Sequence, residues 1–189
     1  MFIFVLTAII PISTVSAQSF NNVEALEEYL YSHPSNSKDN PINITINTND
    51  SMIEDIAEII KSAHIYVNVD LSGSALKTIP DKLFYREFML GDYHILTGII
   101  LPKNITAIGD GAFLLCDSLT SITIPDSVTS IGYMAFSLCD NLTSVTFQGS
   151  ITKNNFGETF IGDLRVKYFA GGIGTYTRKN VERRAWTKQ

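Results

Sequence analysis

The chain has 189 residues, of which 45% are hydrophobic and only 17% carry a charge, and its formal net charge is −5. This composition predicts one domain with a hydrophobic core and a surface rich in neutral polar groups. The negative net charge argues against a general nucleic-acid-binding protein. From Asp163 onward, basic residues outnumber acidic ones by seven to two. This basic tail either docks on the acidic remainder of the chain or contacts an anionic surface.

The first 17 residues predict a signal peptide. An apolar run from Phe2 to Ile10 is followed by Val15-Ser16-Ala17, whose small side chains have the spacing of a cleavage site after Ala17. No Lys or Arg precedes the run, which departs from the usual pattern, and a buried N-terminal segment is the alternative. The run is too short to span a membrane comfortably. We therefore expect a secreted or cell-surface protein with no membrane span once residues 1–17 are removed.

Helices and strands alternate in the pattern of residues 18–75. Apolar positions three or four residues apart predict helices near residues 23–30 and 52–63. Alternating Ile, Val and Leu residues predict strands near residues 42–46 and 65–71. This helix, strand, helix, strand order precedes the repeats described next, and we expect it to form an N-terminal α/β cap over their first unit.

Two adjacent stretches of the sequence are near copies. LPKNITAIGDGAFLLCDSLTSIT, from Leu101 to Thr123, is followed by IPDSVTSIGYMAFSLCDNLTSVT, and matching residues lie 23 positions apart. A looser copy begins at Leu76 and carries an insertion within YREFMLGDYH, residues 85–94. A fixed period in the twenties is typical of a solenoid, because each unit is too small to bury its own apolar face and must share a core with its neighbours.

The spacing within one unit predicts which side chains face solvent. An apolar residue at every second position predicts an extended segment, so that the small side chains between them point outward. The outward positions form the candidate binding face: Ser121, Thr123, Ser144 and Thr146, with Gly98 and Ile100 in the first complete unit. Three such strands give a strip only about 15 Å wide, which predicts weak, avidity-dependent binding. Gly109 and Gly132 mark turns where the backbone is expected to need a positive φ.

Cys116 and Cys139 occupy equivalent positions in adjacent units. Stacked units place such positions about 5 Å apart, which is within the Cα range of a disulfide. Buried free thiols, a Cys116–Cys139 disulfide and reactive thiols are all open from this reasoning.

The sequence shows no constellation that predicts catalysis, a metal site or a cofactor. The histidines His33, His64 and His94 have no metal-ligand spacing, and no nucleophile elbow, phosphate loop or dinucleotide fingerprint is present. We therefore expect no enzyme; an active site that gathers His94 and Asp92 is the alternative. Aspartates in the repeat turns are expected to bind local backbone groups, with calcium binding as the alternative: Asp110, Asp117, Asp126 and Asp140.

The tandem units, and IPDSVTSIGYMAFSLCDNLTSVT above all, resemble the BspA-like class of leucine-rich repeats. That class occurs in surface proteins of spirochaetes, other oral and gut bacteria and some parasitic protozoa. The segment Ile65–Phe84 is similar to the family's entry into its first repeat, and Asp163–Arg178 to C-terminal segments of spirochaete members. The resemblance implies reduced, buried cysteines. It also implies adhesion to protein partners, either host matrix proteins or other bacterial surface proteins. A structural spacer or surface antigen without a specific ligand is the alternative.

The expected fold is an α/β repeat: a short leucine-rich-repeat solenoid with an N-terminal α/β cap and a small C-terminal cap. The predicted divisions are a signal peptide (1–17), the N-terminal capping region (18–75), the repeats (76–149) and a C-terminal cap with the basic tail (150–189). An aromatic binding patch is the alternative use of the last region, because it is rich in Phe, Tyr and Trp. A monomer without cofactors, nucleic acid or a membrane span is expected.

Overall fold

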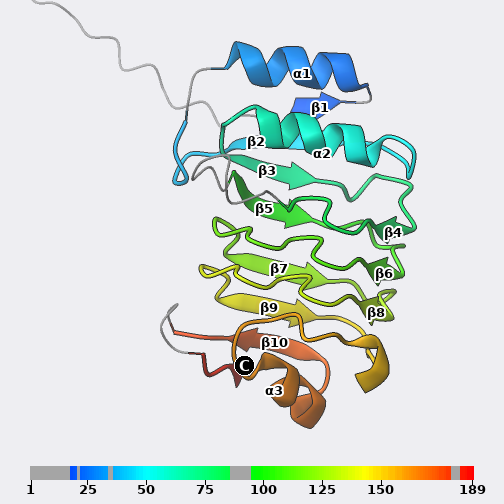
Figure 1. The fold of residues 1–189 in the computed structure, drawn as a ribbon, viewed down its shortest axis with the longest axis vertical. Helices are drawn as coiled ribbons and strands as arrows, with labels where there is room; N and C mark the ends of the chain where they lie inside the picture. Colours follow the sequence, from blue (N-terminus) through cyan, green and yellow to red (C-terminus); the bar gives the residue numbers. More distant parts are fainter. Residues whose placement is uncertain (1–17, 21, 34–35, 86–94, 180–183) are drawn as a thin grey trace, which may run out of the picture.

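The computed structural model describes residues 18–20, 22–33, 36–85, 95–179 and 184–189. The predicted signal peptide lies outside the described residues. So do Asp92 and His94, the pair considered for an active site. Across the described part of the chain, mixed helices and mostly parallel strands give an α/β repeat fold (Figure 1).

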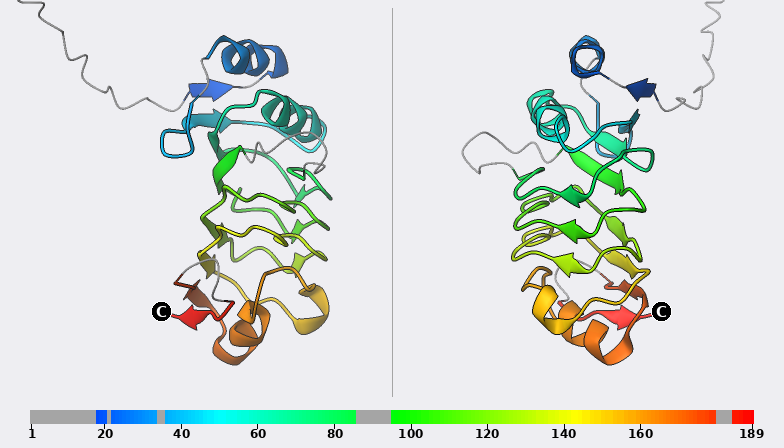
Figure 2. Two further views of the ribbon diagram at one scale, coloured as in Figure 1. Left: turned by 60° about the vertical axis from the view of Figure 1, so that its left-hand side comes forward. Right: turned by 90° about the vertical axis from the view of Figure 1, so that its right-hand side faces the viewer.

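The N-terminal α/β region contains β1 (Gln18–Phe20), α1 (Val23–Ser32), β2 (Ile42–Ile46), α2 (Ile53–Ser62) and β3 (Val67–Asp70). Helix α1 begins after Asn22, whose side-chain oxygen accepts a hydrogen bond from the Ala25 backbone N–H at 2.7 Å. Ile53, Ile56 and Ile60 form the buried side of α2. Both helices lie on one side of the parallel strands (Figure 2), so their apolar faces are buried against the sheet.

The repeats form two parallel ladders of strands. The longer strands are β5 (Leu96–Ile100), β7 (Ser121–Ile124) and β9 (Ser144–Phe147), and the shorter ones are β4 (Thr78–Ile79), β6 (Ala107–Ile108) and β8 (Ser130–Ile131). Ser121 is paired with Ser144 and Thr123 with Thr146, so the 23-residue offset is the register of the β7–β9 pair. Ile122, Ile124, Val145 and Phe147 are buried between these outward positions. The predicted inward and outward alternation is therefore confirmed.

A column of phenylalanine rings runs through the core between the two ladders. The ring centroids of Phe84 and Phe113 lie 5.6 Å apart, those of Phe113 and Phe136 5.0 Å, and those of Phe136 and Phe160 4.8 Å, with nearly parallel planes at each step. We call these four residues the Phe column. Each ring covers a face of the next one, so the repeats share one core rather than forming separate ones.

The repeat geometry continues past residue 149, the boundary predicted from the sequence. Gly157 donates its backbone N–H to the Ile131 carbonyl at 2.9 Å, as Gly132 does to Ile108 one unit earlier at 2.8 Å. Phe156 forms a parallel bridge with Ile131, and Phe160 supplies the last ring of the Phe column. The sequence pattern fades here because the residues change while the backbone path is retained.

The prediction for Gly109 and Gly132 was wrong. Neither residue has a positive φ; the left-handed positions in these turns are Gly111 and, one unit later, Met134. A Cβ on Gly132 would lie 2.6 Å from the backbone nitrogen of Asp110, and a Cβ on Gly109 would lie 2.6 Å from that of Asp81. Glycine is required because the coils approach one another closely at this point.

The C-terminal unit extends the sheet of the last repeats. It contains a 3-10 turn (Lys153–Asn155), α3 (Leu164–Gly171), β10 (Gly174–Thr177) and β11 (Thr187–Lys188). Strand β10 pairs antiparallel with β9, which gives the order β11-β10-β9-β7. The side chains of Phe156, Tyr168, Tyr176 and Trp186 are buried. The aromatic residues of this unit therefore fill its interior, which argues against the alternative of an exposed aromatic patch.

Candidate binding face

The structure places every residue of the predicted face on the outward side of the strands. Ser121 and Thr123 are exposed on β7, and Ile100, with 57% of its surface exposed, is the large apolar residue that β5 exposes. Ser144 and Thr146 are only half-buried on β9, because β10 pairs along its edge and the Thr146 hydroxyl lies 2.8 Å from that of Thr175. Gly98 lies on β5 one position before the bulky Ile99–Ile100 pair.

The face is wider than the repeats alone. Asn68 on β3 is paired with Asn43 on β2 and with Gly98 on β5, while Asp70 is paired with Ile100. At the other end, Thr175 and Thr177 on β10 lie opposite Thr146 and Ser144. We use the name strand face for the outward side of β2, β3, β5, β7, β9 and β10. At about 4.8 Å per strand its six strands span about 29 Å, compared with the 15 Å expected from three strands.

Sequence reasoning missed the contributions of the N-terminal region and of β10. The alternation of Ile42, Ile44 and Ile46 does indicate that Asn43 points away from the core. That alternation does not show which strand Asn43 would lie beside, because residues 18–75 do not share the repeat period. The antiparallel return of β10 has no repeat signal at all.

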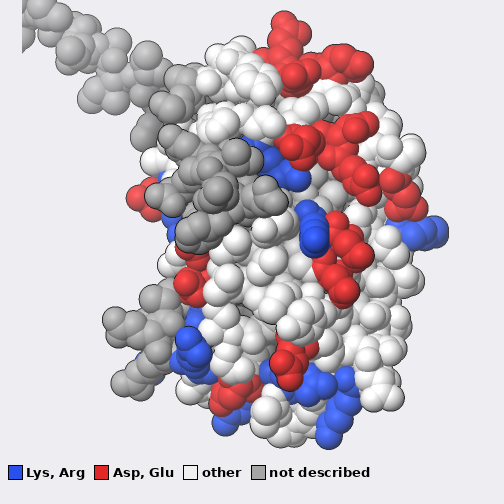
Figure 3. All heavy atoms as spheres, in the orientation of Figure 1, with Lys and Arg blue, Asp and Glu red and all other residues white. Residues whose placement is uncertain are grey.

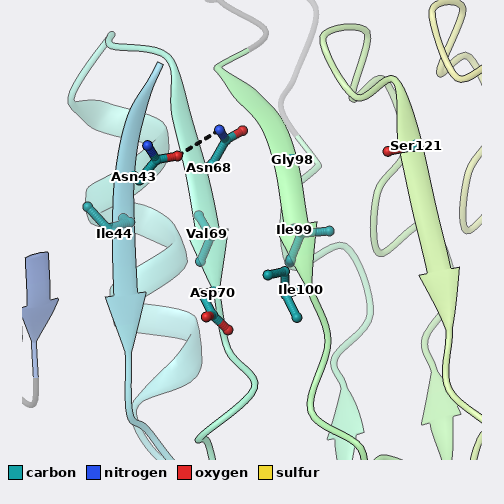
Figure 4. A pocket seen from close by; sticks show the side chains of 9 residues that line it. All are labelled: Asn43, Ile44, Asn68, Val69, Asp70, Gly98, Ile99, Ile100 and Ser121. Carbon is teal, nitrogen blue, oxygen red and sulfur yellow. Dashed lines mark hydrogen bonds between the residues drawn. The ribbon is translucent and has the colours of Figure 1, made fainter. Parts of the chain in front are cut away.

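A hollow of about 410 Å³ lies in the strand face where the N-terminal region meets the repeats (Figure 4). We call it the strand hollow. Strands β5 and β7 lie side by side there but belong to separate hydrogen-bonded sheets. Its lining contains two of the predicted residues, Ile100 and Ser121, together with Gly98; the others are Asn43, Ile44, Asn68, Val69, Asp70 and Ile99.

Hydrogen bonds fix the polar side of the strand hollow. The Asn68 side-chain amide donates to the Asn43 side-chain oxygen at 2.8 Å (Figure 4), and the Thr97 hydroxyl donates to the Asn68 side-chain oxygen at 2.7 Å. Gly98 has no room for a side chain, because a Cβ there would lie 2.7 Å from that same Asn68 oxygen. Glycine at this position therefore lets the Asn68 side chain approach β5 closely.

Charge is distributed unevenly along the molecule. In Figure 3, acidic side chains gather over α1 and α2, and basic ones mostly at the C-terminal end. Several basic groups of the C-terminal unit bind its own backbone. Arg165 donates to the carbonyls of Phe156 and Lys153 at 3.0 and 3.1 Å, and Lys188 to that of Gly171 at 2.6 Å. For these residues, docking on the chain itself is the interpretation that the contacts support.

Arg178 is buried at the junction between β10 and the last repeat. It donates to the carbonyls of Leu142 at 2.7 Å, Asp140 at 2.6 Å and Cys139 at 3.4 Å, and its guanidinium lies 5.4 Å from the centre of the Trp186 ring. Burial lowers the pKa of this guanidinium below its ordinary value, opposed by the nearby Asp140 carboxylate. Arg178 therefore satisfies carbonyl groups that no following repeat covers.

Cys116 and Cys139 are both free and buried. The Cys139 thiol donates to the Phe113 carbonyl at 3.0 Å, and the Cys116 thiol contacts the Phe84 carbonyl at 3.6 Å. Each sulfur is therefore directed to a backbone carbonyl of the preceding coil. Burial raises the pKa of Cys116 to about 12 and raises that of Cys139 well above its ordinary value of 9.0. These are the properties of thiols that fill space in a core.

The buried thiols predict a loss of stability in alkali. Above pH 9 the unfolded chain releases thiol protons that the folded chain retains, so the free energy of unfolding falls by about 1.4 kcal/mol per pH unit for each thiol. Urea denaturation between about pH 8 and pH 10 should show this fall in the wild-type chain. In the double variant, Cys116→Ala with Cys139→Ala, the free energy of unfolding should fall less steeply with pH. The two thiols are the only titrating groups that differ between this variant and the wild-type chain. If the free energy of unfolding has the same pH dependence in both proteins, the loss of stability in alkali is not caused by the two buried thiols.

His33 and Asp110, two of the groups considered for catalysis or metal binding, have local partners. Nδ1 of His33 lies 2.6 Å from the Tyr29 carbonyl oxygen. The Asp110 carboxylate accepts the Tyr133 backbone N–H at 2.7 Å, as expected for a turn aspartate. Within the described ranges, no three His, Cys, Asp or Glu side chains group in a way that could hold a metal ion. None of the helices described has the length and apolar character needed to cross a membrane.

Comparison with protein families agrees with the repeat geometry. The family model described as the BspA type leucine rich repeat region matches residues 77–161, in six copies. No curated protein matches the chain. The matched segment begins just before β4 and ends just after Phe160, the last ring of the Phe column. Residues 77–161 are therefore similar to the leucine-rich repeats of the BspA type.

Proposed function

We propose that this chain is an exported binding module that attaches to other proteins through the strand face. In this proposal the repeats form a short solenoid, with the N-terminal α/β region and the C-terminal unit as caps that cover its apolar ends. Proteins with repeats of this type are often surface-associated and take part in protein interactions, and such repeats are generally non-enzymatic. Adhesion of cells to host matrix proteins, or to other bacteria, is the role proposed for it.

The observation that carries the proposal is the composition of the strand face. Small hydroxyl and amide side chains are paired in register within each of its two sheets, Asn43 with Asn68 in one, and Ser121, Ser144 and Thr177 in the other. They present side-chain hydrogen-bonding groups close to the surface of the sheet, with few large side chains that would keep a partner at a distance. A face about 29 Å wide and four residues deep is smaller than the roughly 800 Å² per partner of a standard interface. Each contact is therefore weak, and many copies on one surface would act together.

A double substitution tests the strand face. Thr123→Arg with Ser144→Arg places two large charged side chains at its centre, and we expect retention on immobilised matrix proteins or bacterial cells to fall at least about tenfold. The control, Asn104→Arg with Tyr133→Arg, adds the same two groups at exposed positions outside the long strands. Thermal unfolding of both variants shows whether the fold is retained.

Three other results would argue against the proposal. Equal loss of retention in the control would show that added charge, and not the strand face, is responsible. Undiminished retention in the Thr123 and Ser144 variant would show that another surface binds. Absence of retention of the wild-type chain on every surface tested would favour the second candidate function, a structural spacer or surface antigen. The scarcity of large anchors on the face favours that candidate, because Ile100 is the one large apolar side chain exposed on the described strands of the face.

A further inference from the structure

The strand hollow combines an unpaired carboxylate with an exposed aliphatic surface. Asp70 is half-buried on β3, and one of its carboxylate oxygens accepts the Ser72 backbone N–H at 2.8 Å. No ion pair joins Asp70 to any described Lys or Arg, and neither residue type is present in the lining of the hollow. The lining of the hollow is therefore acidic, and none of the described residues that form it is a cation that could balance Asp70.

The neighbours of Asp70 define the shape of a complementary group. Ile100 lies directly opposite it on β5 and is mostly exposed, and Gly98 on the same strand also lines the hollow (Figure 4). On the far side, the Ser121 hydroxyl has no hydrogen-bond partner among the described residues. A group that fits must be cationic at the Asp70 end and aliphatic over Ile100, and it can carry hydrogen-bonding groups near Ser121.

We propose that the strand hollow binds a Lys or Arg side chain from an extended segment of the partner protein. The segment's backbone would lie over β5, the aliphatic stem would pack on Ile100, and the ammonium or guanidinium would pair with the Asp70 carboxylate on the adjacent strand β3. The span fits, because a four-carbon stem is about as long as the 4.8 Å separation of neighbouring strands. This inference rests on the proposed protein-binding function and gives that function a preference for basic segments.

Amino-acid analogues test the hollow without a known partner. The probes are N-acetyl-lysine methylamide, N-acetyl-arginine methylamide and N-acetyl-norleucine methylamide, the last having a similar aliphatic stem without charge. In ¹⁵N–¹H spectra of the full chain, the two basic probes should shift the backbone signals of Gly98, Ile100 and Ser121 and the side-chain amide of Asn43. Norleucine should bind at least about fivefold more weakly, and added salt should reduce the difference between the probes.

A matched pair of variants assigns the effect to one carboxylate. Asp70→Asn keeps an oxygen for the Ser72 N–H and removes the charge, so lysine-analogue affinity should fall about fivefold while signals elsewhere are unchanged. Asp126→Asn makes the same charge change at an exposed turn outside the hollow and should leave the affinity unchanged. The inference is overturned if norleucine binds as well as lysine, if none of the probes shifts these signals, or if Asp70→Asn binds lysine normally.

The two proposals fail in different ways. If the double arginine variant of β7 and β9 abolishes retention on partner surfaces while the lysine analogue leaves the hollow signals unshifted, the strand face binds proteins without a basic side chain. If the chain binds no matrix protein or cell while the lysine analogue still shifts the hollow signals, the proposed adhesion role fails and the cation site stands.

Discussion

Replacement of Phe113 by alanine should lower the free energy of unfolding by about 3–5 kcal/mol. The Phe113 side chain is fully buried, and its ring stacks on Phe84 on one side and on Phe136 on the other. The substitution removes the buried area, leaves a cavity in the middle of the Phe column and breaks both ring contacts. Urea denaturation followed by circular dichroism measures the change.

Position within the Phe column provides the control for this prediction. Phe160 is only half-buried at the end of the column and has one neighbouring ring in the stack. Phe160→Ala should therefore cost clearly less than Phe113→Ala. If both substitutions cost the same, the rings contribute as separate buried groups, and a core shared along the stack is not what stabilises the repeats.

Replacement of Arg178 by alanine should have the second-largest effect, a loss of about 3 kcal/mol. Three carbonyl groups of the last repeat would lose their donor, and water would have to enter a buried site to replace it. Arg178→Lys should recover only part of the loss, because an ammonium group cannot place two donors in the plane of the guanidinium. Thermal unfolding of the wild-type chain, Arg178→Lys and Arg178→Ala measures whether their stabilities decrease in that order.

Arg165 is a suitable reference for Arg178. It also donates to two carbonyls, but its side chain is less buried. We expect Arg165→Ala to cost about 1 kcal/mol. A value for Arg178→Ala no larger than that would mean that the last repeat does not depend on Arg178 to satisfy its carbonyls.

The C-terminal unit matters for the whole stack because repeat units are stabilised by their neighbours. Strand β10 covers the edge of β9, and Tyr176 and Trp186 bury apolar surface below the last repeat. Loss of Arg178 would loosen this junction first. Arg178 itself lies outside the strand face. Substitutions there should therefore reduce retention on partner surfaces only to the extent that they unfold the chain.

The sequence alone determined the architecture of the repeats. The 23-residue offset predicts which residues become cross-strand neighbours, and the spacing of Leu119, Ile122 and Ile124 predicts which side chains are buried. These features lie within a single repeat unit and recur in the next one. Each copy therefore predicts the same buried and exposed positions as its neighbour. The outward positions of Ser121 and Thr123 followed from the same alternation.

Only the tertiary structure decided what lies beside the repeats. The strand hollow depends on the register between β3 and β5, which brings Asp70 opposite Ile100, and no repeated pattern joins those two segments. The antiparallel return of β10 and the burial of Arg178 are likewise contacts between segments that share no period. The close approach of coils at Gly132 also appears only in three dimensions, because a short distance between backbones cannot be distinguished in the sequence from a turn that needs a positive φ. Periodicity fixes contacts between equivalent positions, whereas contacts between unlike segments are fixed by how the whole chain packs.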